Sequence, residues 1–182
     1  MERVLSHSPD AVIIATGAMP SVPPIPGAEK AFPAQEILCS QLDVGPTVIV
    51  VGGNAMGLET AEWLASKKKR VIVVEMRDEV GSDIEPATKY ALTDRLHDYG
   101  VKFEVRKKVI EVVDNGVICL DENDQRRSLS ADRVVFALGA TPNKDLGREL
   151  PEKIKSYVIG DAKEPRKIID AISEAYALAR SI

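Results

Sequence analysis

The sequence predicts an α/β fold built on a central parallel sheet, and three observations support this. A run of β-branched residues, 48–51, is followed by a glycine-rich turn at 52–57. A segment with helical character, 58–69, then leads into a second β-branched run, 71–74, which ends on the acid Glu75. Strand, glycine turn, helix, strand and acid follow one another in the order of a dinucleotide-binding βαβ unit, so we expect a Rossmann-like three-layer domain.

Composition and charge exclude several classes of protein. Of the 182 residues, 45% are hydrophobic, which is enough for a packed core, and the formal net charge is −4. No basic block suggests nucleic-acid binding, and the one basic run, 67–70, falls between a helix and a strand, where a solvated corner is expected. No segment is apolar for long enough to cross a membrane, and the N-terminus has no apolar signal core, so we expect a cytoplasmic protein.

The cysteines and histidines predict neither a redox pair nor a metal site. Cys39 and Cys119 are far apart and form no CxxC pair, so they match neither a disulfide oxidoreductase nor a metal cluster. Cys119 lies in an apolar run and is interpreted as a small core residue. His7 and His97 are not arranged as a pair. We therefore predict no metal site and no nucleophile–base triad.

The segment before the glycine turn combines a strand with a proline-rich connection. Residues 10–16 are predicted to form a short buried strand that ends at Gly17. Four prolines between positions 20 and 26 exclude helix and central strand and favour extended geometry, as in a linker that leaves one sheet. Residues 34–40 are expected to form a helical turn, and a strand follows at 47–51.

A polar loop and a second helix are expected after the acid. Residues 76–83 are polar and contain a glycine, which is typical of a loop. Pro86 suits the first turn of a helix over 87–99, which Gly100 ends as a left-handed cap. A strand with one wet face is predicted at 101–105. The apolar face of the helix would consist of Leu92, Leu96 and Tyr99.

Alternating apolar and polar residues then indicate a small antiparallel β-meander. Its strands are expected at 109–113, 117–120 and 127–129. The Asn-Gly pair at 115–116, placed between two apolar runs, is typical of a hairpin turn. A buried strand of the parallel sheet is expected to return at 133–138.

The C-terminal segment is expected to form one more strand and one more helix. A short strand at 157–159 would end at Gly160 and Asp161. Pro165 is predicted to open the last helix, which is amphipathic. The apolar face of this helix would contain Ile168, Ile169, Ile172, Ala175, Tyr176 and Ala179.

The glycine turn keeps two of the three glycines of the G-x-G-x-x-G pattern. Gly52 would supply the tight turn, and Gly57 would allow the helix to pack closely on the strand. Asn54 stands where the middle glycine lets the backbone approach a pyrophosphate; asparagine tolerates left-handed angles, but its side chain takes up space. The amides at the start of the helix would still attract a phosphate. The alternative is a glycine-rich turn in an unrelated βαβ unit.

Glu75 lies 23 positions after Gly52, where an acid accepts hydrogen bonds from the hydroxyls of the adenosine ribose. A carboxylate there would repel a 2′-phosphate, which favours NAD(H) over NADP(H). Arg77 could partly offset this preference. The alternative for both residues is an exposed charge at a strand end. Glu59 falls in the first turn of the helix, where the helix dipole alone favours an acid.

Four segments together resemble the flavoprotein reductases that have two dinucleotide-binding domains. The closest resemblance is to the C-terminal part of the 2,4-dienoyl-CoA reductase, trimethylamine dehydrogenase and NADH oxidase branch of the Old Yellow Enzyme family, a region like the pyridine nucleotide-disulfide oxidoreductases. The resemblance covers nearly the whole chain, with all four segments in register. They are IIATGAMPSVPPIPG, VIVVGGNAMGLETAEWL, ADRVVFALGATPN and VIGDAKEPRKIIDAISEAYALA.

The resemblance implies an NAD(P)H-binding domain at 46–140, inserted into a partial FAD-type domain at 1–45 and 141–182. Glu59 would lie near the nicotinamide, and Asp161 would bond the ribityl chain of the flavin. The implied NAD contacts are Gly52, Gly53, Asn54, Ala55, Met56, Gly57, Glu59, Glu75, Arg77 and Gly139. The implied FAD-type contacts are Thr16, Gly17, Gly160 and Asp161.

The function that this implies is an NAD(P)H-binding module of a flavin-dependent oxidoreductase. Hydride would pass from NADH to FAD, for reduction of an enoate, a dienoyl-type compound or another acceptor, while FMN and an iron–sulfur cluster would belong only to parts outside this chain. No glycine fingerprint precedes 10–16, so the FAD-type domain is expected to be incomplete, with little FAD binding and no activity in the isolated chain.

Two other functions remain open, as does the assembly. The chain could be a non-catalytic nucleotide-binding or structural domain that has lost full cofactor binding, which Asn54 favours, or an unrelated doubly wound protein. The expected partners are a nicotinamide dinucleotide and, in the intact protein, a flavin, with no nucleic acid and no membrane. An incomplete FAD-type sheet leaves an exposed edge, so a homo-oligomer or partial disorder is a further hypothesis.

Overall fold

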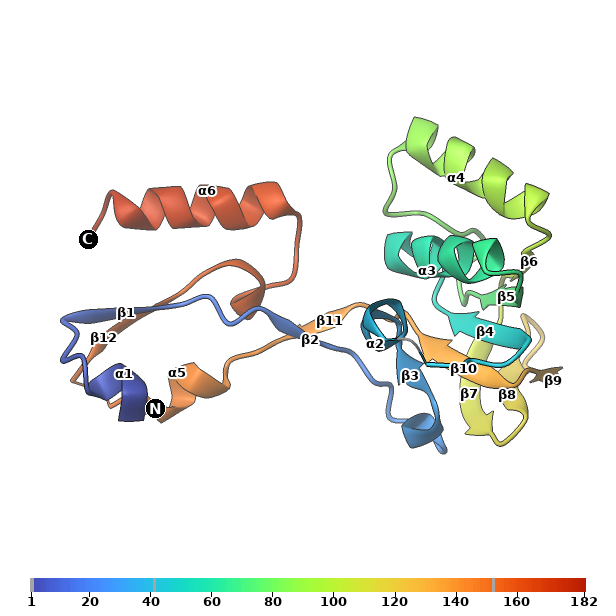
Figure 1. Cartoon of the computed structure of the whole chain (residues 1–182), viewed down its shortest axis with the longest axis horizontal. Helices are drawn as coiled ribbons and strands as arrows, with labels where there is room; N and C mark the ends of the chain where they lie inside the picture. The colour runs from blue at the N-terminus through green and yellow to red at the C-terminus, as the bar shows by residue number, and fades with distance from the viewer. Residues whose placement is uncertain (1, 41, 152) are drawn as a thin grey trace. The chain divides into compact units, whose positions relative to one another are not determined.

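The computed structural model describes residues 2–40, 42–151 and 153–182 (Figure 1). The chain divides into two compact units. The central unit is Pro20–Gly139, and the flanking unit combines Met1–Met19 with Ala140–Ile182. The segment 20–45, which we assigned to the FAD-type domain, thus packs with the central unit.

A five-stranded parallel sheet forms the middle of the central unit, in the order β3-β10-β4-β5-β6. This confirms the predicted α/β class and its parallel sheet. In chain order the strands are β3 (Phe32–Pro33), β4 (Thr47–Val51), β5 (Arg70–Val74), β6 (Lys102–Glu104) and β10 (Arg133–Phe136). Strand β4 lies between β5 and β10. After β4 the chain adds β5 and β6 on one side of it, and later adds β10 on the other side. A crevice is therefore expected at the carboxyl ends of β4 and β10.

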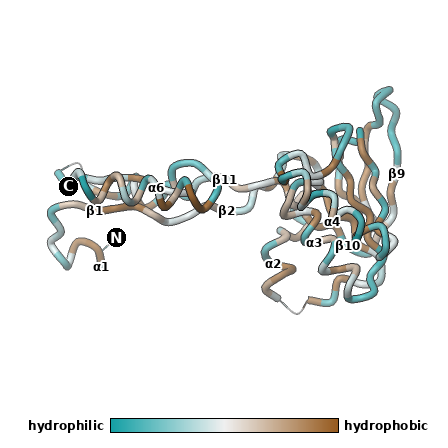
Figure 2. The backbone as a smooth tube through the Cα atoms, turned by 90° about the horizontal axis from the view of Figure 1, so that it is seen from above, coloured by the Kyte–Doolittle hydropathy of each residue, from teal (hydrophilic) through white to brown (hydrophobic). Residues whose placement is uncertain are grey.

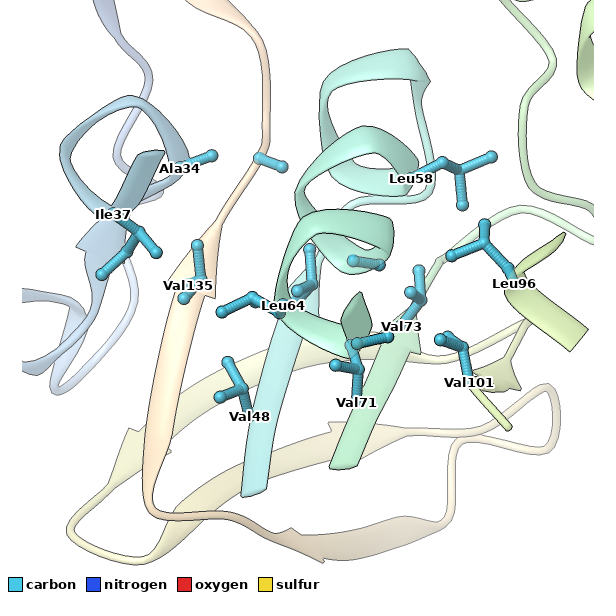
Figure 3. Packing of buried hydrophobic residues seen from close by; sticks show 14 of the residues in the cluster. Ala34, Ile37, Val48, Leu58, Leu64, Val71, Val73, Leu96, Val101 and Val135 are labelled. Carbon is cyan, nitrogen blue, oxygen red and sulfur yellow. The ribbon is translucent and has the colours of Figure 1, made fainter. Parts of the chain in front are cut away.

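Three helices cover one face of this sheet (Figures 1 and 3). They are α2 (Ala34–Cys39), α3 (Ala55–Ser66) and α4 (Pro86–Asp98). Successive residues of a strand point to opposite faces, and Val48 and Val50 of β4 point to this one. Figure 3 shows Val48 among side chains of the sheet and of the helices that cover it, including Leu64 of α3 and Ile37 of α2. The fully buried residues here include Ala34, Val48, Val50, Leu58, Ala61, Leu64, Val73, Leu96 and Val135.

An antiparallel meander covers the opposite face, as the sequence predicts. Its strands are β7 (Lys108–Val113), β8 (Gly116–Leu120) and β9 (Arg126–Ser130), paired in that order. Ile49 and Phe136 of the parallel sheet pack against it. Other buried members of this second core are Val51, Val74, Val112, Val117, Ala131 and Val134. The short 3₁₀ helix η1 (Ala28–Lys30) also belongs to this unit.

In its described residues, the flanking unit is built from two short sheets, three α-helices and one 3₁₀ helix. Strand β1 (Ala11–Ile14) pairs in parallel with β12 (Lys155–Val158), and β2 (Ala18–Pro20) pairs with β11 (Ala140–Pro142). The chain enters the central unit at the end of β2 and leaves it just before β11. The remaining elements are α1 (Glu2–Leu5), α5 (Asp145–Glu149), the 3₁₀ helix η2 (Gly160–Ala162) and α6 (Ile168–Ala179).

Burial in the flanking unit is sparse, which corrects one prediction. We expected a buried strand at 10–16, but in β1 only Ile14 is buried, and Ile13 is 46% exposed. In the part of the chain that the structure describes, β1 and β12 form a two-stranded sheet, and no residue of β12 is buried. None of the residues of α6 is buried, although hydrophobic and hydrophilic residues alternate along it (Figure 2).

Several element boundaries differ from the predictions because of capping. Helix α3 begins at Ala55, three residues earlier than expected, because the Asn54 side chain caps it. Helix α6 begins at Ile168 rather than at Pro165, with Lys167 as its N-cap. Tyr99 follows the end of α4 and is 50% exposed, so its assignment to the apolar face was wrong.

Other predicted signals are confirmed. Pro86 is the first residue of α4, and the preceding Glu85 carboxylate accepts hydrogen bonds from the amides of Ala87 and Thr88, at 3.0 and 3.1 Å. These bonds hold the pKa of Glu85 below its usual range. Gly100 takes the expected left-handed conformation, with φ +73°. Within the described residues, the longest apolar stretches of helix fall short of what a membrane crossing requires.

Candidate functional site

A cavity of about 680 Å³ lies at the carboxyl ends of β4 and β5 and also reaches Leu138, which follows β10 at the expected crevice. Its volume is in the range of small-molecule and cofactor pockets. The walls combine the glycine turn, the end of β5, the loop that follows it, the start of the meander and the proline-rich segment. The lining residues are Pro23, Pro24, Ile25, Val51, Gly52, Gly53, Asn54, Val74, Glu75, Met76, Arg77, Ser82, Asp83, Lys107, Lys108, Val109 and Leu138.

The glycines of the turn bring three backbone segments into close contact. Gly52 has φ +111°, and a Cβ on it would lie 2.4 Å from the carbonyl oxygen of Ala137. A Cβ on Gly57 would lie 1.9 Å from the carbonyl oxygen of Gly52. These are backbone obstacles, so no side chain fits at either position. The roles predicted for Gly52 in the turn and for Gly57 in close packing agree with this geometry.

Asn54 joins the glycine turn to the neighbouring strand. Its Oδ1 accepts a hydrogen bond from the Gly57 amide at 3.0 Å, which caps α3. Its Nδ2 donates to the carbonyl oxygen of Ala137 at 2.6 Å, just beyond β10. The backbone of Asn54 is extended, with φ −79° and ψ −179°, so the expected left-handed tolerance is not used. Asparagine at this position therefore acts as a cap and a cross-link.

Glu75 is held with its carboxylate against the glycine turn. Its Oε2 accepts a hydrogen bond from the Gly53 amide at 2.7 Å, and its Oε1 accepts one from the Arg77 amide at 2.8 Å. Arg77 in turn donates from its guanidinium to Ser82 Oγ at 2.6 Å. The fixed carboxylate lines the cavity and retains further lone pairs, so it can accept hydrogen bonds from the hydroxyls of a ligand.

The loop after Arg77 reaches back over the glycine turn. Its Gly81 amide donates to the carbonyl oxygen of Gly53 at 2.6 Å, and Val80 is buried. Asp83 at its end accepts a hydrogen bond from the Ala55 amide, 3.1 Å from each carboxylate oxygen. We predicted this segment only as a polar loop. Asp83 lies 28 positions from Ala55 in the chain, and nothing in the local sequence indicates the contact.

Lysines at the start of the meander were also missed as site residues. Lys107 and Lys108 line the same cavity as Glu75 and Asp83. Lys107 pairs with Glu104, with a 2.9 Å distance between Nζ and Oε2. Lys108 begins β7 and Lys107 precedes it, so both lie beside a meander that the sequence pattern places apart from the glycine turn, and no local pattern indicates their place in the cavity.

The other residues predicted to contact NAD lie around the cavity rather than in its wall. Ala55, Met56 and Gly57 form the first turn of α3, directly behind Asn54. Glu59 is exposed on the same helix. Gly139 follows Leu138, a lining residue, and has φ +86°.

The predicted FAD-type residues all belong to the flanking unit. The Thr16 hydroxyl donates to the carbonyl oxygen of Asn143 at 2.6 Å, and the Asn143 amide donates to the carbonyl oxygen of Gly17 at 3.0 Å. Gly160 begins η2 with φ +59°, and the side chain of Asp161 is exposed. The structure thus joins Thr16 and Gly17 to Asn143, and no hydrogen bond between the described residues joins either of them to Gly160 or Asp161.

Glu174 of α6 fixes the loop that contains Gly160. Its carboxylate accepts hydrogen bonds from Lys163 Nζ and the Gly160 amide, at 2.9 and 2.8 Å, and pairs with the Arg166 guanidinium. The bonds from Lys163, then Arg166, then Gly160 lower the pKa of Glu174 to about 2. Sequence analysis did not single out this acid, because its partners lie 8 to 14 positions away.

Among the described residues, no group of three histidine, cysteine, aspartate or glutamate side chains is placed to hold a metal ion. Cys119 is buried, and burial raises the pKa of its thiol, as expected for a core residue. Cys39 is exposed. Both thiols are free.

The cavity residues fit a dinucleotide. Gly52 and Gly53 line the cavity, and the N-terminus of α3 beside them carries the partial positive charge that attracts a phosphate. Glu75 supplies a fixed acceptor for ribose hydroxyls at the end of the second strand. The cavity therefore has the polar groups for both the phosphate and the sugar of such a ligand.

Comparison with family models and curated proteins gives consistent matches. Residues 5–174 match the model of the pyridine nucleotide-disulphide oxidoreductases. The whole chain is 35% identical to an NADH oxidase of Thermoanaerobacter brockii over 189 residues and spans 29% of that protein. It is 32% identical to a cinnamate reductase of Clostridium sporogenes over 185 residues and spans 28% of it.

Solved structures match over nearly the whole chain. A 2-naphthoyl-CoA reductase in complex with 2-naphthoyl-CoA is 27% identical, with a TM-score of 0.89 over 96% of this chain and 27% of that one. The histamine dehydrogenase from Rhizobium sp. 4-9 is 25% identical, with a TM-score of 0.88 over 100% of this chain and 32% of that one. In each case the match covers less than a third of the larger protein.

Proposed function

Because the chain belongs to the pyridine nucleotide-disulphide oxidoreductase family, we propose that it is the NADH-binding module of a flavin-dependent oxidoreductase. The observation that carries the proposal is one cavity, lined by Gly52, Gly53, Asn54 and Glu75 together. The glycine turn, which begins at Gly52, and the acid Glu75 are 23 positions apart in the sequence. Both line this cavity, as the binding of a dinucleotide requires.

Each part of the cavity has a role in this proposal. The pyrophosphate binds at the N-terminus of α3, where the Ala55 amide is bonded to Asp83 in the cofactor-free chain, and Glu75 accepts hydrogen bonds from the adenosine ribose. The Glu75 carboxylate disfavours a 2′-phosphate, so NADH is preferred to NADPH. Arg77 and the two lining lysines reduce that preference without reversing it, because the Glu75 carboxylate is bonded directly to the Gly53 amide of the turn.

The chemistry belongs to the bound cofactors: NADH supplies a hydride and FAD accepts it. Glu59, exposed on α3, orients the nicotinamide end, and Asp161 with Gly160 binds the ribityl side of the flavin. Within the family we propose the Old Yellow Enzyme branch, in which an iron–sulfur cluster and FMN serve the acceptor. An enoate-type acceptor is supported by the likeness to a cinnamate reductase and a 2-naphthoyl-CoA reductase.

Calorimetric titration of the purified chain with NADH, NADPH and ADP tests the proposal. We expect saturable binding of NADH and ADP at one site, with NADPH weaker, because ADP carries the groups that the cavity recognises. No heat and no thermal shift with any of the three would contradict the proposal. We also expect a colourless preparation, since the glycine fingerprint of this sequence, 52–57, lies at the proposed NADH site; a bound-flavin absorbance would refute that expectation.

The second candidate is a nucleotide-binding or structural domain without catalysis. Asn54 favours it, because this side chain occupies the position of the middle glycine. The two candidates differ at the nicotinamide end. A hydride-transfer module should bind NADH more tightly than ADP, whereas equal affinities for NADH and ADP would favour the structural domain.

A further inference from the structure

An acid of the chain occupies the anion position at the start of α3. Both carboxylate oxygens of Asp83 lie 3.1 Å from the amide nitrogen of Ala55, the first residue of the helix. Backbone amides at a helix N-terminus carry partial positive charge and attract anions. In this structure the Asp83 carboxylate is therefore placed where a phosphate group would be attracted.

The loop that carries Asp83 is fastened to the glycine turn. The Gly81 amide donates to the carbonyl oxygen of Gly53 at 2.6 Å. Val80 is 8% exposed and packs on Gly53, where an added Cβ would lie 2.7 Å from Val80 Cγ1. Ser82 accepts the hydrogen bond from the Arg77 guanidinium. Three contacts thus hold the loop in place. The position of Asp83 against the Ala55 amide is therefore fixed by the fold.

Asp83 also lines the cavity in which the dinucleotide is proposed to bind. Ser82 and Asp83 share the wall with Gly53 and Asn54, and Glu75 lies in the same wall. A pyrophosphate that enters this cavity would bind the Ala55 amide, but that amide is already bonded to the Asp83 carboxylate. Two anions cannot both use that amide, and their charges repel each other.

We propose that Asp83 sets the cofactor affinity of this site by competing with the pyrophosphate for the N-terminus of α3. In the cofactor-free protein its carboxylate satisfies the Ala55 amide, and it must leave that amide before the pyrophosphate binds. Asp83 therefore weakens dinucleotide binding while it stabilises the empty site. The inference rests on the proposed function, and it names the residue that limits affinity there.

The test compares Asp83→Asn with the unaltered chain by calorimetry, using NADH, ADP and adenosine. The variant keeps an oxygen acceptor for the Ala55 amide and removes the charge. We expect affinity for NADH and ADP to rise about two- to fivefold, the size of a charge effect at a helix N-terminus. Affinity for adenosine, which has no phosphate, should not change. The gain should shrink at high salt, since the effect is electrostatic.

Asp78→Asn is the matched control. Asp78 belongs to the same loop and is exposed, but it lines a different hollow, beside Arg106 and Asp121. Its substitution removes the same charge from the loop and should leave the ADP affinity within experimental error. An equal gain in both variants would mean a general charge effect and would overturn the specific role of Asp83.

Other results separate this inference from the proposed function. If the unaltered chain binds ADP and Asp83→Asn binds it equally or more weakly, the competition is refuted while the proposed function stands. If neither protein binds NADH or ADP, both fail. Asp83→Ser, which also offers an uncharged oxygen to Ala55, provides the same comparison should the asparagine variant prove unstable.

Discussion

At the scale of single residues, the distance between α3 and the preceding turn is set by Gly57. The Cβ that any other residue would add lies 1.9 Å from the carbonyl oxygen of Gly52 and 3.4 Å from Ala137 Cβ. The nearer obstacle is backbone, which cannot rotate away as a side chain can. The close packing of α3 on the glycine turn therefore requires that residue 57 has no Cβ.

We expect Gly57→Ala to lower the free energy of unfolding by about 1–3 kcal/mol, the usual cost of forcing an extra methyl group into a packed site. Urea denaturation followed by circular dichroism measures this. Glu59→Ala, an exposed substitution on the same helix, should change the free energy of unfolding by less than about 0.5 kcal/mol. Equal stability of the Gly57→Ala protein and the unaltered chain would show that α3 can move away from the turn without cost.

Glu75 determines cofactor choice in the proposed site. We expect Glu75→Ala to weaken NADH binding roughly tenfold or more, the contribution of hydrogen bonds to a charged group. NADPH binding should change less, because repulsion of the 2′-phosphate disappears at the same time. Calorimetry with both cofactors gives the ratio, and Glu75→Gln separates the loss of charge from the loss of the acceptor. An unchanged NADH-to-NADPH ratio in both variants would exclude Glu75 as the selecting residue.

The role of a single residue could be predicted from the sequence where it depends on residues nearby in the chain. Gly52, Gly57 and Glu75 were predicted from their spacing, and the structure brings the turn and the acid to one cavity. Asn54 was recognised as a departure, but its bond to the carbonyl oxygen of Ala137 joins residues 83 positions apart in the chain. Asp83 was missed for the same reason, since its partner amide is remote in the chain.

At the scale of elements, α6 is attached by charge rather than by burial. None of its residues is buried, and Ile168, Ile169 and Ile172 are 81%, 66% and 59% exposed. Glu174 on this helix binds Lys163, Arg166 and the Gly160 amide. The position of the loop with Gly160 and Asp161 therefore depends on one carboxylate.

This attachment predicts a specific dependence on pH. The pKa of Glu174 is lowered in the folded chain, so the stabilisation it gives is present above the ordinary value of 4.5 and is lost as the pH falls towards about 2. We expect Glu174→Gln to lower the thermal midpoint at neutral pH, with the difference from the unaltered chain shrinking between pH 4.5 and 2. Scanning calorimetry across this range measures the difference.

Glu149→Gln serves as the control for this experiment. Glu149 ends α5 in the same unit and is exposed. Its substitution should leave the thermal midpoint nearly unchanged at every pH. A Glu174→Gln midpoint that matches the unaltered chain at neutral pH would show that the three bonds do not hold α6.

The elements themselves could largely be predicted, but their ends could not. Runs of β-branched residues placed β4 and β5 correctly, and the Asn-Gly pair placed the hairpin between β7 and β8. The start of α3 was wrong by three residues because the cap is a side-chain bond within a glycine-rich stretch. The start of α6 was wrong because proline is permitted, but not required, to begin a helix.

At the scale of the whole molecule, the two units differ in how they are stabilised. Both hydrophobic cores, one on each face of the parallel sheet, lie entirely within the central unit. In the described part of the flanking unit, the buried hydrophobic residues are Ile14 and Ala162. Burial of apolar surface is the main driving force for folding, so the central unit has most of what a folded domain needs.

We therefore expect the fragment 20–139 to fold alone and to bind ADP with the affinity of the whole chain. All residues that line the proposed cofactor cavity lie inside it. Circular dichroism on heating should show one cooperative transition, and calorimetry should give the ADP affinity. A fragment that unfolds without cooperativity, or that loses ADP binding, would show that the flanking unit contributes to the site.

The class of fold could be predicted because alternation and glycine spacing are properties of neighbouring residues. The predicted three-layer arrangement and meander are confirmed by the structure. The association of segment 20–45 with the central unit was not foreseen, since Ala34 and Ile37 enter its core through contacts far along the chain. The hypothesis of a homo-oligomer stays a prediction.

The pairing of β2 with β11 has a consequence for how such a chain can change over evolution. The two ends of the central unit are joined by a hydrogen bond from the Ser21 amide to the carbonyl oxygen of Gly139, at 3.0 Å. Ends that meet this closely are the condition under which one domain can be inserted within another. The central unit can therefore be replaced by a domain of another length, or one that binds another ligand. The strands β2 and β11 on either side of it would still pair in the same register.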